Sequence, residues 1–195
     1  NPRKKVLALD LDNTLWSGIL GEDGYQGILA DTDWPGNAYR DFQNFLRNLR
    51  ASGIILAILS KNNEDDVAEG FDQNRSMPLA LSDFSAKRID WIDKSANLTS
   101  IAEELDLSSD AFVFMDDNPL EVELMKEMRP EVTTVHATGT ASGFPDLLMA
   151  SGRMHSVALT EEDSLRAESY TAQMARKGER KQTKDLETFL AGLNL

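Results

Sequence analysis

Short apolar runs alternate with longer amphipathic stretches along most of this 195-residue chain. Residues 6–11 and 54–59 are apolar almost throughout, which is typical of strands that are buried on both faces. Between them, residues 38–50 carry apolar side chains at helical spacing, and Gly53 ends the pattern. This strand–helix–strand order predicts an α/β fold, with a parallel sheet covered by helices.

The remaining patterns extend this sheet. We expect further strands at residues 79–81, 85–89, 111–115 and 132–136. We also expect three helices, one that begins at Asn63, one along the apolar stripe 98–105 and one over 120–128. The glycine-rich stretch from Gly18 to Gly36 is long enough to form a flap. The intervals 14–60 and 60–94 are too short for a separate cap. The predicted fold is therefore a doubly wound parallel sheet with a flap and no large cap domain.

The character of the sequence changes near its C-terminal end. A polar helix is expected from Thr160 to about Lys177, followed by a basic stretch at 176–184 and a short apolar helix. We expect a catalytic core over residues 1–158 and a helical appendage over 159–195 that packs on the core.

Charge and composition narrow the classes of partner. The formal net charge of −13 repels phosphate backbones and anionic lipids, so we expect neither a nucleic acid nor a membrane as partner. No apolar run approaches the roughly 18 residues that span a bilayer. The sequence contains no cysteine, which excludes thiolate metal sites and a cysteine nucleophile and is consistent with a cytoplasmic protein.

Three of the predicted strands end in polar residues. The first ends in Asp10-Leu-Asp-Asn-Thr14, the second in Ser60-Lys-Asn-Asn63, and a later one runs into Asp116-Asp-Asn-Pro119. Ligands of open α/β sheets bind outside the carboxyl ends of the strands, so these groups should converge on one crevice. Lys94, at the start of a predicted helix, is expected to join them.

These residue types indicate a cation and a phosphoryl group. Mg²⁺ prefers oxygen ligands, and Asp10 and Asp116 can supply carboxylates while Asp117 holds a metal-bound water. Without a cation, so many carboxylates would repel one another. Ser60 can donate a hydrogen bond to a phosphoryl oxygen, and Lys94 can stabilise negative charge on the transferring group.

Three neighbouring residues are candidates for substrate binding. Thr14 either contacts phosphate, orients Asp10 or caps the first turn. Lys61 and Asn62 follow Ser60 closely enough to touch substrate, although a turn and a helix cap would also account for them.

The order of these motifs resembles the four-motif signature of the haloacid dehalogenase (HAD) superfamily. The resemblance implies that Asp10 is the phosphoryl-accepting nucleophile and that Asp12 is the acid and base. It also implies that the backbone carbonyl of Asp12 ligates the metal, together with Asp10, Asp116 and Asp117. Ser60 and Lys94 then bind the transferring group.

A closer resemblance concerns the FkbH-like branch of this superfamily. It is carried by the run Asp10-Leu-Asp-Asn-Thr-Leu-Trp-Ser-Gly-Ile-Leu-Gly-Glu-Asp-Gly24, by Trp91-Ile-Asp-Lys-Ser-Ala-Asn97 and by Asp116-Asp-Asn-Pro-Leu-Glu121. The resemblance implies dephosphorylation of 1,3-bisphosphoglycerate, a phosphorylated three-carbon acid, and loading of the glyceryl group onto an acyl carrier protein for polyketide biosynthesis.

One position departs from that branch. Many glyceryl-loading members have a cysteine between the two motif aspartates, where this chain has Leu11. Acyl transfer would therefore have to proceed directly to the thiol of the carrier. The basic residues at 176–184 are a candidate docking surface for an acidic carrier, although a solvated helix face would also account for them. The alternative is a plain phosphatase that acts on a small or carrier-bound phosphate.

Overall fold

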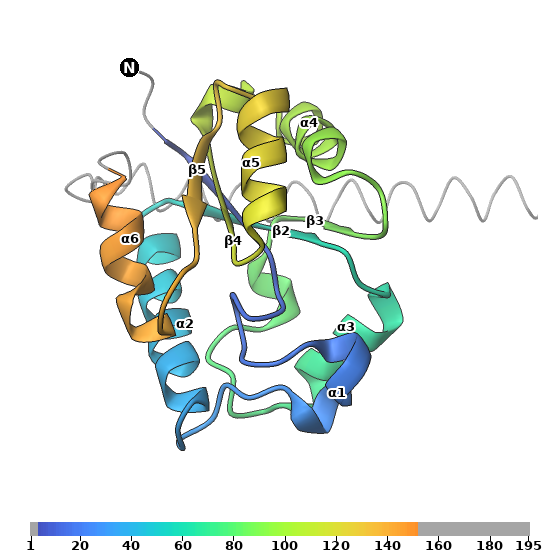
Figure 1. Cartoon of the computed structure of the whole chain (residues 1–195), viewed down its shortest axis with the longest axis vertical. Coiled ribbons are helices and arrows are strands. Elements are labelled where there is room, and N and C mark those ends of the chain that lie inside the picture. Colours follow the sequence, from blue (N-terminus) through green and yellow to red (C-terminus); the bar gives the residue numbers. More distant parts are fainter. Residues whose placement is uncertain (1–3, 152–195) are drawn as a thin grey trace, which may run out of the picture.

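A computed structural model describes residues 4–151 and shows a five-stranded parallel sheet flanked by helices (Figure 1). The strand order is β3-β2-β1-β4-β5, which confirms the predicted doubly wound sheet. The strands are β1 (Val6–Leu9), β2 (Ile55–Ser60), β3 (Ala86–Ile89), β4 (Phe112–Asp116) and β5 (Thr133–His136).

The central strand β1 pairs with β2 on one side and with β4 on the other. Val6 lies opposite Ile55 in β2 and Phe112 in β4. The chain builds β2 and β3 outward on one side and then returns to place β4 and β5 on the other. The strand order therefore reverses between β1 and β4, and a crevice at the carboxyl ends of these strands is the expected ligand site.

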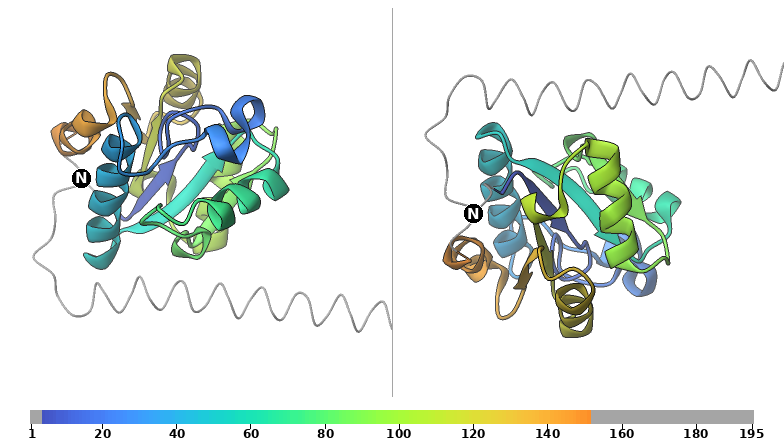
Figure 2. Two further views of the ribbon diagram at one scale, coloured as in Figure 1. Left: turned by 90° about the horizontal axis from the view of Figure 1, so that it is seen from below. Right: turned by 90° about the horizontal axis from the view of Figure 1, so that it is seen from above.

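Side chains of the strands alternate between two apolar cores. Leu7 and Leu9 of β1 point into one core, whereas Val6 and Ala8 point into the other. Figure 2 shows the sheet between α2 and α4. The first core is covered by α1 (Leu20–Gly27), α2 (Gly36–Ala51), α3 (Glu64–Gln73) and α6 (Phe144–Ala150), and the second by α4 (Lys94–Leu105) and α5 (Pro119–Met128).

These cores fix β1 in place. The four residues of β1 are fully buried, and burial of one large aliphatic side chain stabilises a fold by roughly 1.5–3 kcal/mol. The carboxyl end of β1, from which the first polar motif emerges, is consequently a rigid point of attachment.

The predicted strand at 79–81 is wrong. Leu79 is buried, but its N–H donates to the side chain of Gln43 in α2 at 3.2 Å rather than to a neighbouring strand. Leu81 already begins a short 3₁₀ turn, Leu81–Asp83. The apolar residues there reflect packing under a loop and not a strand.

The predicted flap contains a helix. Within the glycine-rich stretch, α1 spans Leu20–Gly27, and the backbone turns at Gly24, whose φ is 65°. Between β1 and β3 the α-helices are α1, α2 and α3, and no further helices form a separate domain there. This agrees with the prediction of no large cap domain.

Two further predictions concern a membrane and the C-terminal appendage. None of the helices in the described part of the chain is long and apolar enough to cross a bilayer. The predicted appendage at 159–195, including the basic stretch 176–184, lies outside the described residues.

Candidate active site

Asp10 follows β1 directly and lies at the bottom of a crevice. Its N–H donates to the carbonyl of Met115 in β4 at 3.0 Å, so the backbone pairing of the sheet continues to this residue. The residue is 7% exposed. The carboxylate is therefore fixed by the two central strands, yet an edge of it reaches the crevice.

Lys94 connects the two strand ends. It is the first residue of α4, and the N-cap Asp93 accepts a hydrogen bond from Ser95 N–H at 2.8 Å, which sets where the helix begins. From this position the Lys94 Nζ lies 2.9 Å from Asp10 Oδ1 and 2.6 Å from Asp116 Oδ2. Burial alone would lower the pKa of Lys94, but the two carboxylates outweigh it and raise that pKa.

The predicted acidic cluster is present. Single carboxylate oxygens of Asp10, Asp116 and Asp117 all lie within 4.8 Å of one another. Burial, and then the charge of Asp10, raises the pKa of Asp116 to about 7 and that of Asp117 to about 6. Lys94 offsets only part of both effects.

These raised pKa values reflect burial first and then negative charge that one lysine does not balance. A cation among the three carboxylates would remove the repulsion, and three oxygen ligands suit a hard dication such as Mg²⁺. The donor set of this cluster therefore fits the predicted metal.

Asp12 is held by three hydrogen-bond donors. Its Oδ1 accepts from the indole N–H of Trp16 at 2.9 Å and from the N–H of Leu20 at 3.0 Å. Its Oδ2 accepts from the amide of Asn62 at 3.0 Å. The loop that allows these contacts turns at Asn13, whose φ is 51°, and Asn13 accepts from Gly18 N–H at 3.0 Å.

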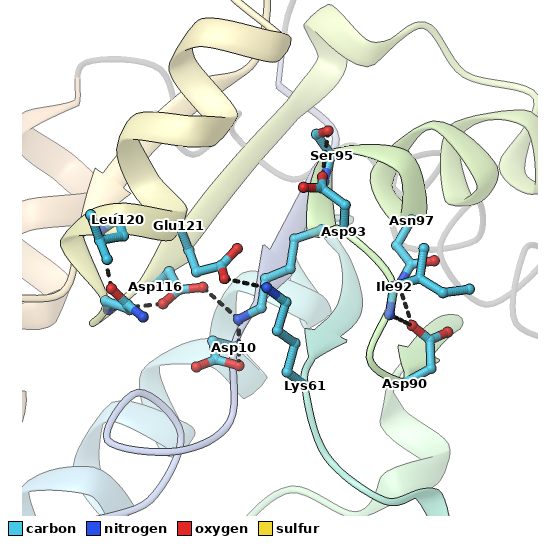
Figure 3. A network of polar contacts seen from close by, with 12 residues as sticks. Asp10, Lys61, Asp90, Ile92, Asp93, Ser95, Asn97, Asp116, Leu120 and Glu121 are labelled. Atoms are coloured by element: carbon cyan, nitrogen blue, oxygen red, sulfur yellow. Dashed lines mark hydrogen bonds and ion pairs between the residues drawn. The ribbon is translucent and has the colours of Figure 1, made fainter.

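The strand ends surround a crevice of about 390 Å³. Lys61 and Glu121 form an ion pair at its wall, with Nζ and Oε1 2.5 Å apart, as the close-up in Figure 3 shows. The crevice is lined by Asp10, Asp12, Asn13, Ile19, Ser60, Lys61, Lys94, Asp116, Asp117, Asn118, Pro119 and Glu121.

Most of the predicted site residues meet in this crevice, and two do not line it. Thr14 is fully buried, and its hydroxyl has no hydrogen-bond partner among the described residues. Asn62 is 5% exposed and donates to Asp12 and to Ser60 instead of facing the crevice.

No site role was predicted for several of the residues that line the crevice, among them Glu121, and none for Trp16. Trp16 is fully buried against Phe71, as an aromatic core residue would be, but its N–H also reaches Asp12. Glu121 was expected in a helix and belongs to one of the FkbH-like motifs, but no role at the site was predicted for it. Its position in the first turn of α5, directly after the Asp116–Pro119 motif, is the sequence signal that places it near the site.

The fold and the crevice together define a class of proteins: doubly wound α/β proteins with an acidic, lysine-bridged cation site at the switch point of the sheet. Within this class, the chain is similar to the N-terminal part of the protein BF1531 from Bacteroides fragilis, which contains a phosphatase domain and was solved in complex with Mg. The identity is 36% and the TM-score 0.74. The match covers 77% of this chain but only 40% of that one.

Two further solved structures match with lower identity. An uncharacterised protein from Corynebacterium glutamicum matches with 16% identity and a TM-score of 0.51, over 76% of this chain and 96% of that one. A HAD family enzyme from Bacteroides thetaiotaomicron, solved as a magnesium complex, matches with 12% identity and a TM-score of 0.48, over 72% of this chain and 95% of that one. No family model and no curated protein matches the chain.

Proposed function

We propose that this chain catalyses Mg²⁺-dependent phosphoryl transfer through a phosphorylated Asp10. The observation that carries the proposal is the position of the Asp10 carboxylate, which lines the crevice, lies 2.9 Å from the Lys94 Nζ and has an oxygen within 4.8 Å of oxygens of the other two acids of the cluster. The phosphatase domain of the Bacteroides fragilis protein, solved with Mg, supports the same activity.

Asp10, Asp116 and Asp117 would hold the metal, together with the backbone carbonyl of Asp12. When bound, Mg²⁺ would neutralise oxygens of the phosphoryl group and let the anionic substrate approach an acidic crevice. Asp10 would then have one carboxylate oxygen for the metal and one for phosphorus.

The reaction would proceed in two displacements. A carboxylate oxygen of Asp10 attacks phosphorus, the bond to the leaving oxygen breaks, and Asp12 donates a proton to that oxygen. Water then attacks the phosphoryl group on Asp10, and Asp12 takes the proton of this water. Lys94 and the Ser60 hydroxyl stabilise the charge that develops on the phosphoryl oxygens.

Phosphate release from aryl phosphates tests this activity. We expect release with Mg²⁺, loss of release after treatment with a chelator, and recovery when Mg²⁺ is added back. A chelated protein that kept its full rate would contradict the metal requirement, and a well-folded protein that released no phosphate from any aryl or acyl phosphate would contradict the activity.

We further propose that the substrate is a glycerate-type phosphate such as 1,3-bisphosphoglycerate and that the acyl group passes to an acyl carrier protein. The FkbH-like resemblance of the strand-end motifs supports this proposal, and the uncapped crevice offers access to a carrier-bound thiol. Because the chain has no cysteine, the thiolate of the carrier would attack the carbonyl carbon of the acyl phosphate directly, so that the thioester bond forms as the bond to the phosphate oxygen breaks and phosphate leaves. Asp10 would act on the remaining phosphate ester of the three-carbon unit.

Intact-mass measurement of carrier proteins tests the proposed acyl transfer. Incubation with 1,3-bisphosphoglycerate should add a glyceryl group to a cognate carrier. Reversal of the charges of Arg176, Lys177, Arg180, Lys181 and Lys184 should slow this transfer, most at low salt, and leave hydrolysis of a small phosphate ester near normal. Phosphate release without any acylated carrier would favour the plain phosphatase.

A further inference from the structure

One buried amide connects two residues of the crevice. The Nδ2 of Asn62 lies 3.0 Å from Asp12 Oδ2 and 3.1 Å from Ser60 Oγ. The amide is 5% exposed and does not line the crevice, so a contact with substrate does not explain why it is polar. A buried polar group is retained where its hydrogen bonds are needed.

The partners determine how the amide is oriented. A carboxylate accepts hydrogen bonds and cannot donate them, so the atom of Asn62 that faces Asp12 must be the nitrogen. The second hydrogen of the same NH₂ group then points to Ser60 Oγ. Ser60 consequently accepts from Asn62, and its own hydroxyl hydrogen is free to point toward the crevice that it lines.

The other carboxylate oxygen of Asp12, Oδ1, is bound by a different segment of the chain. Trp16 N–H and Leu20 N–H both donate to Oδ1, so the carboxylate is bound on one side by the segment that leads into α1 and on the other by the loop after β2. Few torsional positions satisfy three donors at once, which restricts the rotation of the Asp12 side chain.

We propose that Asn62 is a positioning residue that aligns Asp12 for proton transfer and, through the same amide, directs the Ser60 hydroxyl toward the phosphoryl group. This inference rests on the proposed phosphoryl transfer. It differs from the sequence prediction for Asn62, because the residue acts through Asp12 and Ser60 and not by touching substrate. Trp16 supplies the second donor that fixes Asp12.

A pair of substrates separates positioning from substrate binding. Phenyl phosphate needs a proton on its leaving oxygen, whereas dinitrophenyl phosphate has a leaving group that departs as an anion. The value of kcat/KM reports the step that forms the phosphorylated Asp10. Asn62→Leu, which is close to isosteric and removes both hydrogen bonds, should lower kcat/KM for phenyl phosphate by on the order of 10²-fold. The fall for dinitrophenyl phosphate should be at least about tenfold smaller, because only the Ser60 contact is then lost.

A double variant measures the coupling. If Asn62 acts through Asp12, Asn62→Leu should cost little more in phenyl phosphate hydrolysis once Asp12→Asn has removed the acid. The matched control is Asn63→Leu. The neighbouring Asn63 is exposed, and its side chain contacts Asp66 and not the crevice, so its substitution should leave both substrates near the wild-type rate. Thermal unfolding of each variant verifies that the fold is retained.

Three outcomes overturn the inference. Equal losses for the two substrates in a folded Asn62→Leu variant would assign the residue a purely structural role. A higher KM with unchanged kcat for both would mean direct contact with substrate. A wild-type protein that releases phosphate from neither of these substrates nor from an acyl phosphate would overturn the proposed function and, with it, this inference, and the wild-type assay is read before any variant.

Discussion

At the scale of single residues, the charge balance of the crevice depends on Lys94. Its Nζ contacts carboxylates that follow β1 and end β4, and Asp116 is fully buried. Removal of one partner from a buried ion pair typically costs about 3–5 kcal/mol, because the other charge is left without compensation. Lys94 therefore contributes to the stability of the fold as well as to the chemistry of the site.

Lys94→Met should lower the unfolding temperature in chelator, and by more at pH 8 than at pH 5. At the lower pH, Asp116 takes up a proton and no longer needs the lysine, because its pKa is raised to about 7 already with Lys94 present. Differential scanning calorimetry at both pH values measures the effect. Lys126→Met is the control, since Lys126 pairs with Glu123 on the exposed face of α5. An equal fall at both pH values would contradict the raised pKa of Asp116 as the source of the pH dependence.

Asp10→Asn should abolish phosphate release, by about four orders of magnitude or more, while the protein still folds. An amide is a poor nucleophile and a poor ligand of Mg²⁺, and Asn retains the shape of Asp. Phosphate assays together with circular dichroism verify both halves. A folded variant with substantial turnover would contradict the assignment of Asp10 as nucleophile.

The sequence was a good guide to which residues meet and a poorer guide to what each one contacts. Asp10, Ser60 and Asp116 could be placed together because parallel strands bring their carboxyl ends to one edge. The contacts of Trp16 and Asn62 with Asp12 could not be predicted, because they depend on the turn at Asn13 and on side-chain rotamers that no periodicity encodes.

At the scale of secondary-structure elements, the start of α4 positions Lys94. Asp93 caps the helix by accepting from Ser95 N–H at 2.8 Å and from Ser95 Oγ at 2.6 Å. The hydrogen bond from the Ser95 side chain lowers the pKa of Asp93. Burial raises this pKa but offsets only part of the effect. The stabilisation that Asp93 contributes is thus present above the ordinary carboxyl pKa and is lost as the pH falls through the lowered value.

Asp93→Ala should destabilise the protein by about 1 kcal/mol, the usual cost of a lost N-cap. For a chain of this size, that corresponds to a fall of roughly 2–4 °C in Tm. Because α4 begins at Lys94, we also expect a lower kcat. Asn118→Ala serves as the comparison variant for the loss of an N-cap, because Asn118 caps another helix, α5, by accepting from Leu120 N–H at 3.0 Å. No change in Tm for Asp93→Ala would mean that water replaces the cap.

The long helical stripe and most of the short apolar strands were predicted well, whereas two short helices were not. The stripe 38–50 corresponds to α2, and the apolar run 54–59 corresponds to β2 within a residue. The helices α1 and α6 were missed, because α1 contains glycines and only one of its residues, Leu20, is buried, while α6 has seven residues. Helices this short are stabilised by tertiary packing, which a local pattern does not show.

At the scale of the whole molecule, the acidic cluster makes stability depend on pH and on metal. The folded-state pKa values of Asp116 and Asp117 are raised to about 7 and about 6. The folded protein therefore binds protons that the unfolded chain has released, and its stability falls as the pH rises from about 4 through 7. A bound dication would remove this penalty, because it replaces the protons.

In chelator, the Tm should therefore be higher at pH 5 than at pH 8. Without chelator, Mg²⁺ at about 10 mM, roughly ten times the upper end of typical KM values, should raise the Tm mainly at pH 8. Thermal unfolding over this pH range with Mg²⁺ and with chelator measures both effects. The Asp116→Asn variant should lose most of the pH dependence. A Tm in chelator that rises from pH 5 to pH 8 would contradict the raised pKa values.

The position of β1 at the centre of the sheet has a consequence for synthesis on the ribosome. Its first neighbour, β2, emerges after about fifty residues, but its other neighbour, β4, begins only at Phe112. Until then, one backbone edge of a wholly apolar strand has no partner in the nascent chain. We expect the nascent chain to depend on chaperones until then, and the crevice to form only when translation delivers Asp116 to the side of Asp10.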